Sequence, residues 1–457
     1  MRSVRAATRD VFRSLWIRNF RLFFVGQLIS QVGNWLTLVA QTLLVLELTN
    51  SGIALGILAA AQFGPILVLG PWAGLVADRS DKRRLLLIVQ TLAMAQSFTL
   101  AALAASGHPP VGAIYAVAVF GGITMAFDNP TRRSFVVEMV PESDIANAVS
   151  LNSALMTSSR VIGPALAGLL VVTVGYGWAF AGDGLSYIAV LAGLLMMRPS
   201  ELRPAPVTPK AKGQVREGFR YIRGMPELFV PMAMMAVVGT LSYNFPTVFP
   251  LFVTRDLGGS DALFTVFFSV VSLGSLVGAL TMARRPDVGV RHVSLAAIGF
   301  GTVLAVMALA PSQAFALALA LVMGFFSITF VVSSTAIVQL RAAPEMRGRV
   351  LALQAMLFLG STPIGGPIVG WVAEQFGARW SLALGSTAAL AAGAWGLSML
   401  RRMAAAPGPA ATLDVPAPPD GLVVAAAGGE PLEDPYEVAV EVAADAGAGE
   451  MRGTVRA

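Results

Sequence analysis

The chain has 457 residues, of which 56% are hydrophobic and only 13% are charged, and its mean hydropathy is +0.71. The charged share is about half of that in an ordinary soluble domain. This composition excludes a soluble globular protein and indicates a chain that crosses a membrane many times.

The predicted elements are helices, because lipid offers no partner for an unpaired backbone group. A bilayer core of about 30 Å needs roughly 20 mainly apolar residues per spanning helix. Twelve segments meet this requirement, so the sequence predicts an all-α integral membrane protein with twelve transmembrane helices. The predicted spans are residues 20–47, 52–77, 85–105, 111–135, 145–173, 177–197, 226–253, 261–283, 292–310, 313–340, 349–374 and 378–400.

The positions of Lys and Arg predict the orientation, since these residues stay on the cytoplasmic side of the spans. With a cytoplasmic N-terminus, 27 of them fall in cytoplasmic segments before residue 403 and two, Arg255 and Arg379, in outer loops. We therefore expect a multi-pass protein of the cell (inner or plasma) membrane with both termini in the cytoplasm. We expect membrane lipids as partners of this basic inner face, and no nucleic acid is needed to explain its charge.

An internal repeat divides the chain into two halves. Pro141-Glu142 matches Pro344-Glu345, and Gly163-Pro164 matches Gly366-Pro367, at the same offset of 203 residues. Six spans precede a basic loop and six follow it. The predicted organisation is an N-terminal segment (1–19), an N-terminal six-helix half (20–197), a cytoplasmic linker loop (198–225), a C-terminal six-helix half (226–402) and a disordered acidic cytoplasmic tail (403–457). The tail is rich in Ala, Gly, Pro and acidic residues, a composition that cannot bury a core.

Enzymatic and metal-dependent functions have little support. The chain has no cysteine and only two histidines, His108 and His292, both in predicted loops, so we expect no metal site and no cofactor. It also lacks the nucleophile elbow, the phosphate-binding loop and the His-Glu-x-x-His motif. The sequence therefore predicts a protein that is not an enzyme and does not use ATP directly.

The stretch GLVADRSDKRRLL, residues 74–86, places a cluster of charges between the second and third spans. Two six-helix halves joined by a basic loop, together with this motif, resemble the major facilitator superfamily, whose substrate site lies between the halves. The resemblance implies an inner gate that latches the halves in the outward-open state; a plain cationic membrane anchor is the alternative. The predicted gate residues are Gly74, where a small residue permits close helix approach, Asp78, Arg79, Lys82, Arg83 and Arg84.

Three further segments narrow the resemblance to the macrolide-efflux and enterobactin-exporter branch of that superfamily. They are NFRLFFVGQLISQVGNWLTLVAQTLLVLELTNSGIALG (19–56), FDNPTRRSFVVEMVPESDIANAVSLNSAL (127–155) and RVIGPALAGLL (160–170). The resemblance implies a monomeric exporter driven by proton antiport, with a helix-kink motif at Gly163, Pro164 and Gly168. Pro164 removes a backbone hydrogen bond and bends the fifth span, while the glycines permit close packing; an ordinary kink is the alternative.

Polar residues inside the spans are candidates for a substrate cavity. Gln27, Gln31, Asn34 and Gln41 share one face of the first span, although amides at such positions also hold helix bundles together. Arg160 in the fifth span and Asn244, at a predicted break in the seventh, complete the set. Amides and aromatic rings suit a lipophilic, cationic or zwitterionic compound.

Two carboxyl groups are candidates for proton coupling, Asp128 in the fourth span and Asp183 in the sixth. The alternative for Asp128 is a fixed ion pair with Arg132, one turn later, and Asp183 has the alternative of a water-filled vestibule. The combined prediction is a secondary transporter that exports a small lipophilic molecule, such as a drug-like compound, secondary metabolite or siderophore. An uncoupled facilitator, an importer of a nutrient or lipid, and a membrane sensor or scaffold remain alternatives.

Overall fold

The computed structural model of the protein describes residues 12–203, 214–285 and 287–405. Within these residues every regular element is a helix and no strand occurs. Eleven segments are long and apolar enough to cross a membrane, and the fifth predicted span is represented by a shorter apolar stretch, Ile162–Val171. The predicted all-α membrane fold is therefore confirmed, and most helix ends lie within a few residues of the predicted ones.

The first half consists of long helices that follow the predicted spans. The fifth and sixth spans are two helices that follow each other directly across a kink at Gly175, and both carry the label α6; the φ of Gly175, 82°, is in the region that glycine adopts most easily. The elements are η1 (Arg13–Trp16), α2 (Arg18–Thr49), α3 (Gly52–Arg79), α4 (Lys82–Ala105), α5 (Val111–Glu138), η2 (Glu142–Asp144), α6 (Ile145–Leu195) and η3 (Pro199–Glu201).

The second half begins after the linker and contains two interrupted spans. The predicted break in the seventh span is present between α8 and α9, and a second break separates α13 from α14. The linker contributes α7 (Gln214–Gly224), and the elements of the second half are α8 (Pro226–Leu241), α9 (Phe245–Leu251), η4 (Phe252–Asp256), α10 (Asp261–Ala283), α11 (Val290–Ala308), α12 (Gln313–Arg341), α13 (Pro344–Leu359), α14 (Thr362–Phe376) and α15 (Ala378–Ala405).

The linker predicted as a loop contains α7, a finding that the apolar-span analysis could not give because α7 is short and charged. Residues 406–457 of the predicted tail lie outside the described residues. Several spans begin at a residue whose side chain caps the N-terminus of the helix. Ser51 accepts a hydrogen bond from the N–H of Ala54, and Asp81 accepts one from the N–H of Arg84, so both satisfy free donors of a helix N-terminus.

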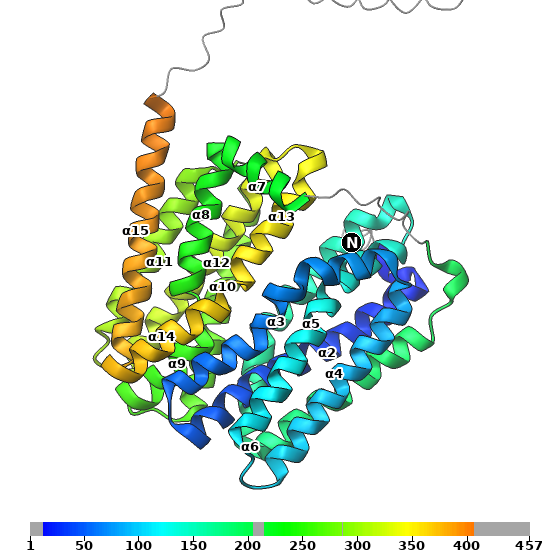
Figure 1. Ribbon diagram of the computed structural model, residues 1–457, viewed down its shortest axis with the longest axis horizontal. Helices are drawn as coiled ribbons and strands as arrows, with labels where there is room; N and C mark the ends of the chain where they lie inside the picture. Colours follow the sequence, from blue (N-terminus) through cyan, green and yellow to red (C-terminus); the bar gives the residue numbers. More distant parts are fainter. Residues whose placement is uncertain (1–11, 204–213, 286, 406–457) are drawn as a thin grey trace, which may run out of the picture. The chain divides into compact units, whose positions relative to one another are not determined.

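The helices pack in two groups that meet along two contacts. In the first group α2 and α4 lie against α6, and α3 lies against α5; in the second α10 lies against α12, and α11 against α15. The groups meet where α3 crosses α14 and where α6 crosses α10. Figure 1 shows both groups as bundles of long helices.

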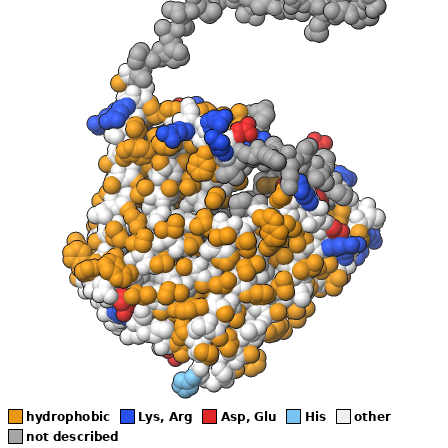
Figure 2. All heavy atoms as spheres, viewed as in Figure 1, with side chains coloured by type: hydrophobic (Ala, Val, Ile, Leu, Met, Phe, Trp, Pro, Cys, Tyr) orange, Lys and Arg blue, Asp and Glu red, His pale blue; other side chains and the backbone are white. Residues whose placement is uncertain are grey.

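The two ends of the bundle carry different segments, and we call them the linker end and the opposite end. The linker end carries α7, the α3–α4 turn and the last residues of α15, and the opposite end carries the α2–α3 and α14–α15 turns. Figure 2 shows hydrophobic side chains over the visible side of the bundle and Lys and Arg gathered toward the linker end. Exposed side chains such as Trp178 (72%) and Trp380 (64%) would be unfavourable in water, so this apolar surface indicates a lipid-facing side.

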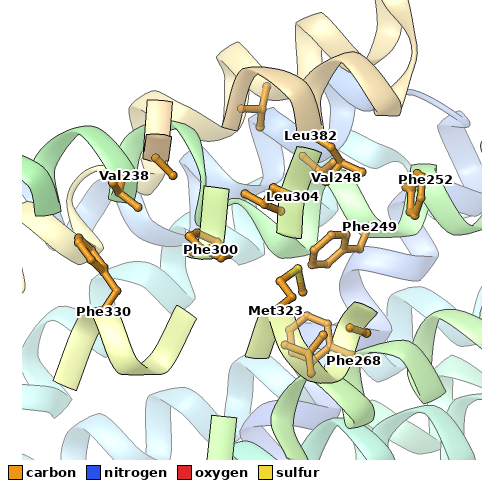
Figure 3. Packing of buried hydrophobic residues seen from close by; sticks show 14 of the residues in the cluster. Val238, Val248, Phe249, Phe252, Phe268, Phe300, Leu304, Met323, Phe330 and Leu382 are labelled. Carbon is orange, nitrogen blue, oxygen red and sulfur yellow. The ribbon is translucent and has the colours of Figure 1, made fainter. Parts of the chain in front are cut away.

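The interior of the second half is rich in aromatic residues. Phe249, Phe300 and Phe330 are fully buried, and Figure 3 shows them among aliphatic side chains from several helices. Phe249 packs on Phe267 with ring centroids 5.0 Å apart. Both halves bury polar side chains, but the buried ionisable residues among those described, Lys82, Arg132, Glu138 and Asp183, all belong to the first half.

Candidate functional site

A buried arginine organises polar side chains in the first half. Arg132 on α5 is 8% exposed, and its Nη2 forms an ion pair of 3.0 Å with Oδ2 of Asp128, one turn earlier. Nη1 donates to Oε1 of Gln27 on α2 at 3.0 Å, and Nη2 also donates to Oδ1 of Asn129 at 3.0 Å. A buried guanidinium needs a carboxylate and additional acceptors, and these three residues supply them.

Two more amides extend this network to a third helix. Gln90 on α4 donates from Nε2 to Oδ1 of Asp128 at 2.6 Å, and Gln31 donates from Nε2 to Oε1 of Gln27 at 3.3 Å. Asp128 therefore has a partner at each oxygen, which is the arrangement of the ion-pair alternative with Arg132. Gln27 and Gln31 are 1% and 9% exposed, so both amides contact protein neighbours in this arrangement.

The other two amides of the predicted cavity face lie farther along α2. Asn34 is exposed, and its Oδ1 accepts a hydrogen bond of 2.8 Å from the hydroxyl of Tyr187. Gln41 is 1% exposed; its Oε1 accepts from Nε2 of Gln62 at 2.9 Å, and its Nε2 donates to the carbonyl of Ile114 at 3.4 Å. Of the four amides, Asn34 alone is exposed; Gln27 and Gln41 bond to other helices of the first half, and Gln31 bonds to Gln27 on α2.

Asp183 occupies a different environment from Asp128. Its carboxyl group is 1% exposed, and Oδ2 accepts hydrogen bonds from the hydroxyls of Thr37 on α2 at 2.5 Å and Ser97 on α4 at 2.7 Å. Oδ1 has no hydrogen-bond partner among the described residues, and no cation there contacts the carboxyl group. Gly33 lies beside Oδ1, where any added Cβ would collide with it. Asp183 is thus a buried acid surrounded by hydroxyl groups.

At the opposite end, the two halves meet through glycines. A Cβ added at Gly56 on α3 would lie 2.6 Å from the carbonyl oxygen of Gly366 and 2.8 Å from Cα of Pro367 on α14. A Cβ added at Gly52 would lie 2.6 Å from the carbonyl oxygen of Gly370. The backbones approach this closely because glycine has no side chain. We call Gly52, Gly56, Gly366 and Gly370 the glycine crossing.

The glycine crossing was not predicted from the sequence, although the spacing of its glycines is a recognised pattern of close helix contact. Each pair has the spacing Gly-x-x-x-Gly, which places both glycines on one face of a membrane helix. The repeat had drawn attention to Gly366 only as a counterpart of Gly163. The pattern marks a close helix contact but does not identify the partner helix.

Polar contacts join the halves beside the glycine crossing. The backbone N–H of Gly52 donates to Oε2 of Glu374 at 2.6 Å, and Nη1 of Arg255 lies 3.5 Å from the same oxygen. Arg255 also donates to Oδ1 of Asn50 at 3.3 Å and to the backbone carbonyl of Asn50. Because Asn50 and Gly52 belong to the first half and the other two residues to the second, these contacts hold the opposite end closed.

At the linker end, two residues of the predicted gate make contacts within the first half. Lys82 is 7% exposed, and its Nζ lies 2.6 Å from Oε1 of Glu138 on α5. Arg83 donates from Nε to the carbonyl oxygen of Leu194 at 2.8 Å, near the C-terminus of α6, where a cation is favourable. Both side chains therefore tie α4 to its own half in this arrangement.

The remaining charges of the gate motif are exposed. Arg84 lies 3.5 Å from Asp81, three residues earlier, so this pair is local. Asp78 and Arg79 are exposed at the end of α3, and neither has an ion-pair or hydrogen-bond partner within the described part of the chain.

Gly74 of the predicted gate lies near the end of α3, and Gly278 lies 204 residues later near the end of α10, close to the offset of the internal repeat. A Cβ added at Gly74 would have no neighbour within 4 Å, so α3 makes no close approach there in this arrangement. A Cβ added at Gly278 on α10 would lie 2.6 Å from the carbonyl oxygen of Phe325 on α12. The close helix contact expected at Gly74 is therefore absent there in this arrangement, and one is present at Gly278.

The helix-kink motif lies beside the second contact between the halves. Gly163 on α6 faces Trp35 on α2, and a Cβ there would lie 2.6 Å from Cβ of Trp35. The indole lies 6.1 Å, between ring centroids, from Phe268 on α10 of the second half. Pro164 is buried inside α6. Two predicted residues of α6 lie outside the described side chains: Arg160 and Gly168.

Asn244 marks the break between α8 and α9. It is 2% exposed; its Nδ2 donates to the carbonyl oxygen of Thr240 at 2.6 Å, and its Oδ1 has no partner among the described residues. A cavity of about 10 Å³ adjoins the break, which is room for about one water molecule. This cavity is too small for a substrate, so we assign it a structural role.

Aromatic rings gather around Tyr243, next to the break. Its ring centroid lies 5.1 to 5.3 Å from those of Phe245, Phe300 and Phe358, and 6.4 Å from that of Phe330. Tyr243 and Phe358 are partly exposed. This aromatic cluster gives the second half an apolar, polarisable surface, whereas the first half offers amides and an ion pair.

The chain is similar in sequence and fold to known membrane transporters. A family model described as "Transmembrane secretion effector" matches residues 8–430. The chain is 24% identical to a staphyloferrin A transporter of Staphylococcus aureus, over 78% of this chain and 90% of that protein. It is 24% identical to macrolide efflux protein A of Streptococcus pyogenes, over 81% and 93%. A crystal structure of a bacterial homologue of the human lysosomal transporter Spinster matches with a TM-score of 0.68 at 14% identity, covering 84% of this chain and 96% of that one.

Proposed function

Because this chain belongs to the transmembrane secretion effector family of the major facilitator superfamily, we propose that it exports a small lipophilic molecule by alternating access. The observation that carries the proposal is the unequal state of the two ends. The glycine crossing and the Arg255–Glu374 contacts close the opposite end, while Asp78 and Arg79 at the linker end have no partner among the described residues. A carrier with one closed end and one unlatched end is in one of its two access states.

The distribution of cations supports placing the linker end in the cytoplasm. Lys and Arg gather toward that end in Figure 2, and α7 with its arginines lies there. With this orientation the structure represents an inward-facing state. A substrate then enters from the cytoplasm or the inner leaflet, and export follows when the linker end closes and the opposite end opens.

The difference between the two halves supports an amphipathic substrate. Asn34 in the first half presents an exposed amide, and the aromatic cluster around Tyr243 in the second half presents partly exposed rings. Amides hydrogen-bond polar groups of many kinds, while aromatic faces bind apolar or cationic groups. The macrolide efflux relative supports a drug-like compound, and the staphyloferrin transporter supports a siderophore.

For the coupling ion we propose a proton, carried by Asp183 in preference to Asp128. Asp128 is already neutralised by Arg132 at 3.0 Å. Asp183 has hydroxyl groups but no cation in contact among the described residues, so a proton is the available means of neutralising it. Because Thr37, Ser97 and Asp183 come from three helices, a change of charge there acts on the packing of α2, α4 and α6 together.

Dissipation of a proton gradient tests this function. Everted membrane vesicles are acidified, a pH-sensitive dye reports release, and macrolides, dyes, siderophores and lipophilic cations are added in turn. We expect at least one compound to release protons with the wild-type protein, Asp183→Asn to abolish the release, and Asp128→Asn to retain most of it per amount of folded protein. Full release by Asp183→Asn would contradict the assignment of the carrier, and flux of a labelled compound without proton release would contradict antiport.

The role of Asp78 gives a separate prediction. Asp78→Asn removes an exposed charge that has no partner among the described residues, so we expect the free energy of unfolding to change by less than about 0.5 kcal/mol. Loss of a latch that forms only in the outward-open state is expected to reduce export about tenfold. Thermal unfolding of the purified protein and export from cells check the two parts. Equal export by mutant and wild type would favour the cationic-anchor alternative.

A further inference from the structure

Helix α7 in the linker has two chemically different faces. On its inner face Ile222 is 4% exposed, and a Cβ added at Gly218 would lie 2.8 Å from Cδ1 of Leu353 on α13. The hydroxyl of Tyr221 accepts a hydrogen bond of 2.9 Å from the backbone N–H of Ala343, at the start of α13. The inner face is therefore fixed to the second half.

An ion pair adds to this attachment. Nη1 of Arg349 on α13 lies 2.8 Å from Oε2 of Glu217. Glu217 is the one acidic residue of α7, and this pair occupies it. The negative charge of the helix is thus directed toward α13 and away from the outer face.

The outer face of α7 is basic and exposed. Arg216, Arg220 and Arg223 are exposed, and Phe219, between them, is 49% exposed. Their spacing of i, i+3, i+4 and i+7 places all four on one side of the helix. None of the three guanidinium groups has an ion-pair partner within the described residues, so that part of the chain supplies no counter-charge to this face.

The position of α7 brings this face to the membrane boundary. Arg223 precedes Pro226, the first residue of the spanning helix α8, by three residues, a distance of at most about 10 Å along the chain. Phe229, one turn into α8, is 41% exposed and packs against Trp395 of α15. Figure 1 shows α7 beside α8 at the linker end of the bundle. Since the headgroup layer begins where apolar exposure ends, we place the last turn of α7 beside that layer.

We propose that the outer face of α7 binds anionic phospholipid headgroups of the leaflet at the linker end. The guanidinium groups of Arg216, Arg220 and Arg223 bind lipid phosphates, and Phe219 enters the boundary between headgroups and acyl chains. Basic helices with an aromatic residue on the same face bind anionic membranes in this way. Because the inner face is bonded to α13, bound lipid anchors the linker end of the second half to the membrane. This surface is separate from the substrate pathway and does not depend on the proposed function.

A fluorescent reporter on α7 tests the proposal in the full-length protein. The chain has no cysteine, so Phe219→Cys provides a single site for an environment-sensitive maleimide dye. The labelled protein is placed in nanodiscs of phosphatidylcholine alone or with about one third phosphatidylglycerol. We expect higher, blue-shifted emission with the anionic lipid and loss of the difference at high salt, since screening weakens such binding. Equal emission in both lipids would overturn the proposal.

A matched pair of charge variants separates α7 from the general surface charge. In the reporter background, Arg216→Gln/Arg220→Gln/Arg223→Gln removes three charges from α7, and Arg284→Gln/Arg401→Gln/Arg402→Gln removes three exposed charges elsewhere at the linker end. We expect the first variant to lower the apparent affinity for phosphatidylglycerol at least tenfold and the second to change it less than threefold. An equal effect of both variants would overturn a site on α7. The salt titration of the unsubstituted reporter protein needs no charge variant to fold.

Discussion

Replacing Gly56 with alanine is expected to open the opposite end of the bundle. The new Cβ would lie 2.6 Å from the carbonyl oxygen of Gly366 and 2.8 Å from Cα of Pro367, and backbone atoms cannot rotate away. Overpacking of this kind costs about 1 to 3 kcal/mol. The cost applies only while α3 and α14 are in contact, so it shifts the ratio of open to closed molecules by roughly 5- to 150-fold.

Cysteine accessibility measures this shift. Leu251 is fully buried next to Gly52, and the chain has no native cysteine, so Leu251→Cys is a unique reporter of the closed contact. We expect Gly56→Ala to raise its rate of labelling by an impermeant maleimide about tenfold or more. Gly64→Ala is the control, because it makes the same change on the same helix where a Cβ would have no neighbour within 4 Å. Equal labelling in the two variants would show that the glycine crossing does not close the opposite end.

The second large effect is expected at the buried ion pair of the first half. Arg132→Met retains much of the side-chain volume but leaves Asp128 without its cation and removes one of the two hydrogen-bond donors to Oε1 of Gln27. Loss of one member of a buried ion pair costs about 3 to 5 kcal/mol, because the other charge stays desolvated. We expect the free energy of unfolding to fall by that amount, measured as a lower midpoint of thermal or denaturant unfolding in detergent.

A double-mutant cycle checks the cause of this loss. Asp128→Asn/Arg132→Met removes both charges, and we expect it to be more stable than Arg132→Met alone, since no unpaired carboxylate remains. Arg79→Met is the control for loss of an exposed arginine and is expected to change stability by less than about 0.5 kcal/mol. If Arg132→Met and Arg79→Met had equal effects, the network around Arg132 would not contribute to stability.

The spans could be predicted because hydropathy is a local property. The segment 261–283 was predicted from its apolar residues alone and is a helix with those bounds, and the break near Asn244 followed from Pro246 and Pro250. Each of these features depends on residues within one or two helical turns. The length and composition of a segment are sufficient to determine them.

The partners of the polar residues could not be predicted in the same way. Lys82 pairs with Glu138, which is 56 positions away, and Gly52 donates to Glu374, which is 322 positions away. Such pairs depend on how each helix is rotated about its axis and on which helices are neighbours. A single sequence specifies neither of these, so Lys82 could be placed at the linker end but not assigned to a contact within the first half. Asp128 was the exception, because its partner Arg132 is one turn away.

The glycine crossing also determines how easily the closed end can be released. A large side chain that packs between residues of the other helix must lose those contacts before the helices separate, and it regains its rotamer freedom only afterwards. Glycine has no side chain to withdraw or to order. Separation of α3 from α14 therefore exposes little new apolar surface at these four positions, and the polar contacts that must break beside them are those of Glu374 and Arg255. At the glycine crossing, the absence of side chains sets how closely α3 and α14 approach. The contacts of Glu374 and Arg255 beside it set how much free energy is needed to separate the two helices.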